Sequence, residues 1–121
     1  MTIDVERYQP HIYISRWRGV VTLEEVSQAS QIRQQFADED GNGNYVVILD
    51  AREVDEVPFH PKELGRKAMV DDRLLKFIVV RAPFLLKLAN DLITMQTSIR
   101  TEFVDTFEEA LERAQEILNE T

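Results

Sequence analysis

The chain has 121 residues, no cysteine and a formal net charge of −8, from 14 Lys and Arg against 22 Asp and Glu. This length and a 44% share of hydrophobic residues describe one globular domain that needs no disulfide or metal to fold. The lack of cysteine excludes a thiolate zinc site and a cysteine nucleophile, and the acidic balance argues against nucleic-acid binding.

The first half of the sequence predicts a hairpin, a helix and a buried strand. Residues 3–6 alternate apolar and polar side chains, and residues 12–18 form a second strand after a turn at Pro10. Thr22 and Glu25 have the spacing of a capping box at the start of a helix whose apolar stripe is Val26, Ala29, Ile32 and Phe36. Residues 45–49 are continuously apolar, which indicates a central parallel strand before a polar connector over residues 50–60.

The second half predicts two further strands and three helices. Pro61 and Pro83 each stand where a helix begins, and the helix after Pro83 extends to about residue 97. Residues 74–80 form a buried strand and residues 99–104 a half-exposed one, before a last helix capped by Thr106. We therefore predict a single α/β domain over residues 1–121. Its order is β-β-α-β-α-β-α-β-α, with a mostly parallel five-stranded sheet that has one antiparallel strand.

This order resembles the STAS fold of bacterial anti-sigma-factor antagonists, and especially the SpoIIAA-like proteins. The resemblance covers nearly the whole chain. Its motifs are Gly19 with residues 22–25, the buried strand ending at Asp50, residues 76–80, Phe103 and residues 107–111. The resemblance implies a regulatory protein-binding module.

One motif of the antagonists is missing. Where they carry Asp-Ser-Ser-Gly with a phosphorylated serine, this chain has Pro58-Phe59-His60-Pro61, and residues 50–80 contain no serine or threonine. The phosphorylation switch therefore does not carry over to this chain, which favours the SpoIIAA-like branch.

His60 is the one candidate for chemistry, because it follows a central strand whose last residue, Asp50, is placed to orient it as a general base. No nucleophile or second histidine near it in the sequence supports catalysis, so we predict no catalytic residue. We interpret the acidic residues 53–56 as a solvated loop and predict no metal site and no cofactor.

The stretch from Lys62 to Lys87 is basic in an otherwise acidic chain. It holds seven Lys and Arg against three Asp and Glu. One interpretation is a docking surface for an acidic partner, made by His60, Lys62, Arg66 and Lys67. The other is an ordinary solvated helix face.

The helix after Pro83 is apolar over about 200° of its circumference, twice what one sheet face covers. The arc includes Phe84, Leu85, Leu88, Leu92 and Met95. A neighbouring helix of the same chain, a second subunit or a bound apolar ligand would cover the excess. We expect a homodimer, with Phe84, Leu88 and Met95 near the contact.

The sequence thus predicts a non-enzymatic interaction or regulatory module. We expect it to be a dimer and to bind a protein partner. The alternatives are a carrier of a small apolar ligand or lipid, and an enzyme using His60. The N-terminal residues are charged from Asp4, and no apolar run approaches the ~18 residues of a membrane span. We therefore expect a cytoplasmic protein without stable membrane insertion.

Overall fold

The computed structural model describes residues 2–56, 72–81 and 101–120, which form five strands and two helices. They are β1 (Ile3–Gln9), β2 (Ile12–Val20), α1 (Leu23–Glu39), β3 (Tyr45–Glu56), β4 (Leu74–Val80), β5 (Thr101–Val104) and α4 (Phe107–Asn119). The predicted α/β class is confirmed. The helices predicted after Pro61 and Pro83 lie outside the described residues. None of the described helices is both long and apolar enough to cross a membrane.

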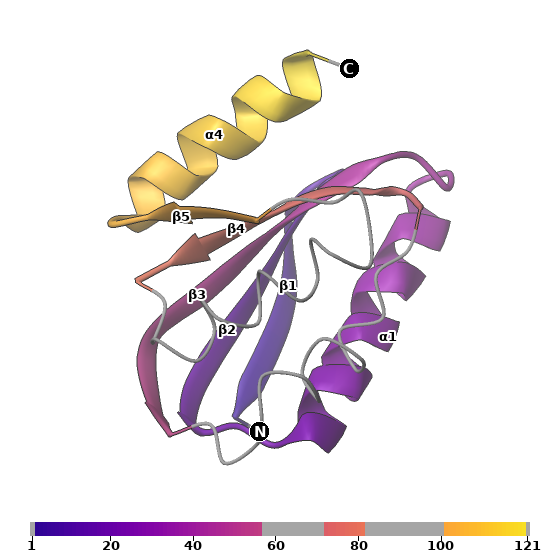
Figure 1. Cartoon of the computed structure of the whole chain (residues 1–121). Coiled ribbons are helices and arrows are strands. Elements are labelled where there is room, and N and C mark those ends of the chain that lie inside the picture. Colours follow the sequence, from indigo (N-terminus) through magenta and orange to yellow (C-terminus); the bar gives the residue numbers. More distant parts are fainter. Residues whose placement is uncertain (1, 57–71, 82–100, 121) are drawn as a thin grey trace.

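The five strands form one sheet in the order β1-β2-β3-β4-β5. β1 pairs antiparallel with β2, and every later pair is parallel, as predicted. Figure 1 shows α1 against one face of the sheet and α4 against the other. Neighbouring strands follow one another in sequence, so each parallel connection moves the chain one strand across the sheet.

α1 begins as its sequence predicts, since the Thr22 side chain accepts a hydrogen bond from the backbone N–H of Glu25. Its buried side differs from the predicted stripe. Ile32 and Phe36 are only half-buried, whereas Arg33 is buried and donates to the Ser15 hydroxyl at 3.1 Å. The sheet surface below α1 carries a polar side chain at Ser15, so the helix turns a hydrogen-bonding residue toward it.

α4 packs its apolar stripe on the opposite face. Ala110, Ala114 and Ile117 join a core cluster with strand residues. These strand residues are Ile12, Ile14, Val46, Ile48, Ile78 and Val80. Thr106 caps the helix by accepting from the backbone N–H of Glu109, as the sequence predicts. Small alanines on the buried side let the helix lie close to the strands.

β3 is longer than predicted. The polar connector expected from Asp50 onward continues as strand to Glu56, so the acidic residues 53–56 are strand and not loop. β2 also runs on to Val20 and pairs with β3 along this length, with Arg16 opposite Asp50 and Val20 opposite Glu56. The β2 ladder satisfies the backbone groups of this polar segment, which overrides its loop-like composition.

Candidate functional site

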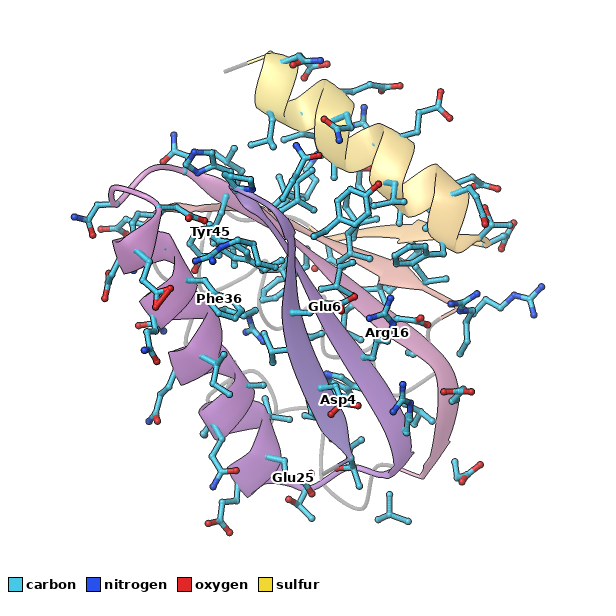
Figure 2. All side chains as sticks on the ribbon, turned by 180° about the vertical axis from the view of Figure 1, so that it is seen from behind. Asp4, Glu6, Arg16, Glu25, Phe36 and Tyr45 are labelled. Atoms are coloured by element: carbon cyan, nitrogen blue, oxygen red, sulfur yellow. The ribbon has the colours of Figure 1, made fainter. Side chains whose placement is uncertain are left out.

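The face of the sheet that carries α4 has a covered half and an open half. α4 packs on β3, β4 and β5. On β2, Ile12 and Ile14 belong to the core beneath α4, whereas Arg16 and Arg18 continue the same face beyond it. Figure 2 shows Asp4, Glu6 and Arg16 on this open part of the sheet. The alternation of side chains along a strand thus leads directly from the core to a charged surface.

A pocket of about 310 Å³ lies in the open half, over the middle and C-terminal parts of the adjacent parallel strands β2 and β3. Five charged residues line it within the described part of the chain: Arg16, Arg18, Asp50, Arg52 and Glu53. We call it the arginine pocket.

A β-bulge in β3 brings these side chains together. Arg16 pairs with Asp50 and Arg18 pairs with Glu53, so two steps along β2 match three steps along β3. An extra residue in one strand breaks the strict alternation of faces there. Asp50 and Arg52 share a face by ordinary alternation, and the extra residue brings Glu53 to that same face, so all three contribute to the pocket.

Asp50 and Arg52 form the innermost ion pair of the pocket. Arg52 donates from Nε to Oδ1 at 2.9 Å and from Nη2 to Oδ2 at 2.7 Å, and its backbone N–H donates to Oδ1 at 3.2 Å. The Asp50 side chain is only 8% exposed. Burial alone would raise the pKa of this carboxyl, but the hydrogen bonds from Arg52 outweigh it and hold the pKa below its usual value. Asp50 is therefore an ionised anchor for Arg52 and a poor proton acceptor.

Arg16 and Arg18 pair with carboxylates across the strands. Arg16 donates to Glu6 on β1, and Arg18 joins Asp4 at 2.8 Å to Glu53 at 3.0 Å. About half of each of the carboxylates Asp4 and Glu6 is exposed. Exposed pairs of this kind contribute little to stability and exchange partners readily.

Phe107, the first residue of α4, lies beneath two of the arginines. The guanidinium carbon of Arg16 is 5.6 Å from the centre of its ring, and that of Arg52 is 5.7 Å away. A cation is attracted to the face of an aromatic ring at such distances. One ring of α4 thus holds two like-charged guanidiniums beside the same pocket.

The lining of the arginine pocket suits binding better than catalysis. The described part of its lining contains no hydroxyl, imidazole or amine, and its buried carboxylate is held ionised by Arg52. Guanidiniums offer several N–H donors in a planar fork that fits oxyanions. Within the part of the chain that the structure describes, no group of three or more acidic or histidine side chains is placed to hold a metal ion.

The site residues that the sequence analysis selected fall outside the described part of the chain. The docking candidates His60, Lys62, Arg66 and Lys67 are outside the described residues, and so is the whole apolar set Phe84, Leu85, Leu88, Leu92 and Met95. Asp50, the residue proposed to orient His60, is described, and its carboxylate forms an ion pair with Arg52.

Sequence reasoning missed the three arginines of the pocket. A signal for two of them was available, because Arg16 and Arg18 continue the period-two alternation of Ile12 and Ile14 onto the same face. The third, Arg52, lies in the segment that was assigned to a loop. As that segment is a strand, Arg52 shares a face with Ile48 and Asp50 by the same alternation.

Comparison with known proteins shows a similarity to a solved structure. No family model matches the chain, and no curated protein matches it. Among solved structures, it is similar to a protein of the DUF3478 family from Shewanella loihica PV-4, described as having a SpoIIAA-like fold. The two share 19% identity with a TM-score of 0.61, over 93% of this chain and 91% of that one. The chain therefore has the SpoIIAA-like fold that its sequence resembles.

Proposed function

We propose that this protein is a non-enzymatic interaction and regulatory module of the STAS type. The observation that carries the proposal is the SpoIIAA-like fold, shared over nine-tenths of both chains with the Shewanella protein. The arginine pocket supports it, because the carboxylates and guanidiniums that the structure describes there are engaged in ion pairs. Groups that are paired in this way favour binding over catalysis.

The partner surface of this proposal is the basic one of the sequence, made by His60, Lys62, Arg66 and Lys67. A module that regulates an acidic partner needs a local positive surface in a chain whose net charge is −8. Exchanging Lys62, Arg66 and Lys67 for glutamine removes three positive charges from it. We expect a partner retained from native lysate by the wild type to be lost by this triple variant.

A matched control separates the surface from the net charge. Gln28, Gln31 and Gln35 are exposed on α1, and changing all three to glutamate alters the net charge by the same amount. The control variant should retain the partner. Equal loss in both variants would contradict a docking surface at the basic residues, and a reaction that His60→Ala abolishes would contradict the non-enzymatic assignment.

The module is also proposed to be a homodimer. The apolar arc with Phe84 and Met95 is twice as wide as one sheet face needs, and hiding a large apolar side chain is worth roughly 1.5–3 kcal/mol. We expect the wild type to sediment as a dimer at micromolar concentration and the variant Phe84→Glu/Met95→Glu as a folded monomer.

Tyr8→Glu is the control for the dimer, because Tyr8 is a large side chain 50% exposed on β1. It should leave the dimer intact. A wild-type monomer would contradict dimerisation. A wild-type monomer that also releases a fatty acid on denaturation would favour the carrier of an apolar ligand instead.

A further inference from the structure

We propose that the arginine pocket binds a small phosphorylated molecule through its phosphate group. The inference is argued only from described residues of β1, β2, β3 and α4, and it uses neither the partner surface nor the dimer proposed above. It rests on the number of guanidiniums in the pocket, on the contacts that hold them in place, and on the N–H donors that the surrounding carboxylates do not use.

Three guanidiniums converge on one pocket of about 310 Å³. Bringing like charges together costs free energy, so a cluster of guanidiniums at the surface indicates a binding role. The Phe107 ring contacts the guanidiniums of Arg16 and Arg52, and Asp50 fixes Arg52 through two further bonds. Both are therefore positioned before any ligand arrives, which lowers the entropy cost of binding.

The arginines keep donors for a ligand. Among the described residues, Arg16 donates only through Nη1, Arg18 through Nε and Nη1, and Arg52 through Nε and Nη2. Each guanidinium has five N–H groups, so several have no acceptor among the described residues. A phosphate has the oxygens to accept from more than one guanidinium at once.

The carboxylates that pair with the arginines decide what a ligand gains. Among the described residues, the lining carries three positive and two negative side chains, and Glu6 and Asp4 on β1 add two carboxylates that pair with Arg16 and Arg18. Asp50 is occupied by Arg52, whereas Asp4, Glu6 and Glu53 are each at least half exposed and can turn away. A phosphomonoester carries up to two negative charges near neutral pH, and a carboxylate carries one. A phosphate that displaces the exposed carboxylates therefore gains more from the three arginines than a carboxylate ligand does.

The pocket has room for more than inorganic phosphate. A volume of about 310 Å³ corresponds to roughly ten water molecules in the liquid. The pocket is also open to solvent on one side, so a small organic group on the phosphate can extend out of it. The ligand class that we propose is therefore a small phosphomonoester.

The test is a titration of the whole protein with inorganic phosphate, glycerol 3-phosphate and acetate at constant ionic strength. Binding is followed through the arginine Nε–Hε resonances in NMR spectra. We expect saturable shifts of the Arg16, Arg18 and Arg52 resonances with both phosphates, and weaker or no shifts with acetate. Shifts that do not saturate, or acetate binding as tight as phosphate, would overturn the proposal.

Arg16→Gln has a closely matched control in Arg7→Gln. Both arginines are about one-third exposed, both pair with a carboxylate, and both lie over an aromatic ring, Arg7 over that of Phe36. Arg7 lies outside the pocket. We expect Arg16→Gln and Arg18→Gln each to weaken phosphate binding about tenfold, the size of one charge-assisted hydrogen bond, and Arg7→Gln to leave it unchanged. An equal loss of phosphate affinity in Arg7→Gln would show that the effect comes from the net charge of the protein and would overturn the proposal.

A variant that binds phosphate more tightly cannot owe its effect to unfolding, so it complements the variants that lose affinity. Glu53→Gln removes the negative charge at the rim, so it should tighten phosphate binding. Its control is Glu39→Gln. Glu39 is an exposed carboxylate at the end of α1, on the opposite face of the sheet, where it pairs with Arg7. Tighter binding in Glu53→Gln alone supports the pocket, and no change or weaker binding in that variant contradicts it.

Discussion

The two halves of the sheet face that carries α4 use ion pairs in different ways. In the covered half, Glu102 on β5 accepts from Lys76 on β4 at 2.8 Å and from Arg113 on α4 at 2.7 and 2.8 Å, and its side chain is 27% exposed. In the open half, Arg18 joins Asp4 to Glu53, whose side chains are 52% and 70% exposed. The covered pairs connect two strands to a helix. The open pairs connect only strands that already share backbone hydrogen bonds.

The difference shows which charges hold the fold and which are available for binding. Hydrogen bonds from Arg113 lower the pKa of Glu102 to about 2, against the opposing effect of burial and with further help from Lys76. A carboxylate bound this firmly contributes to folding. The exposed pairs of the open half are worth 0–1 kcal/mol each by general experience, so a ligand displaces them at small cost.

The largest effect is expected from breaking the covered group. Glu102→Gln removes the charge to which both Lys76 and Arg113 donate, so we expect the free energy of unfolding at neutral pH to fall by about 2 kcal/mol, a value reduced from the full pKa shift because Glu102 is partly exposed. Urea unfolding measures it. The matched change in the open half, Glu6→Gln, should cost less than ~0.5 kcal/mol. Equal losses would contradict the distinction between the halves.

The pH dependence of stability sharpens the same point. The pKa of Glu102 is about 2 in the folded chain and has an ordinary value of 4.5, so its contribution is present above pH 4.5 and disappears as the pH falls toward 2. We expect the wild type to lose stability across this window. The difference between wild type and Glu102→Gln should shrink in parallel. A difference that stays constant down to pH 2 would show that Glu102 acts through packing and not through charge.

Local signals explain what the sequence predicted correctly. The hairpin turn, the caps at Thr22 and Thr106 and the stripe of α4 depend on residues a few positions apart, so they are visible in one sequence. The end of β3 was not visible. Residues 50–56 are polar, and they form a strand only because β2 lies beside them and pairs with them.

The arginine pocket was missed for a similar reason. Candidate selection favoured His60, since histidine is rare and chemically versatile, whereas arginines are common on protein surfaces. What distinguishes Arg16 and Arg52 is the Phe107 ring, which lies 91 and 55 positions further along the chain. That proximity depends on the register of β2 and β3 and on the place where α4 begins.

Phe107 lies at the border between the halves, so changing it should affect both. Phe107→Leu keeps an apolar side chain against the α4 core but removes the ring under Arg16 and Arg52. We expect a loss of about 1 kcal/mol in the free energy of unfolding, from the two cation–π contacts. Thermal unfolding measures it, with Leu111→Met as a control that keeps the core apolar and leaves the ring in place. A loss as small as that of the control would show that the ring does not hold the guanidiniums.

The smallest effect on stability is expected in the open half itself. Arg18→Gln breaks two ion pairs, but the Arg18 side chain is 51% exposed and both of its partners are at least as exposed. The free energy of unfolding should therefore change by less than ~0.5 kcal/mol at physiological salt. Arg113→Gln is the counterpart in the covered half, where the same chemical change removes the bonds to both Glu102 and Glu116 and should cost clearly more. Urea unfolding of the two variants compares them directly. Because the ion pairs of Arg18 contribute so little to folding, a ligand can replace them at little cost in stability. A large loss of stability in Arg18→Gln would instead show that these ion pairs hold the sheet together.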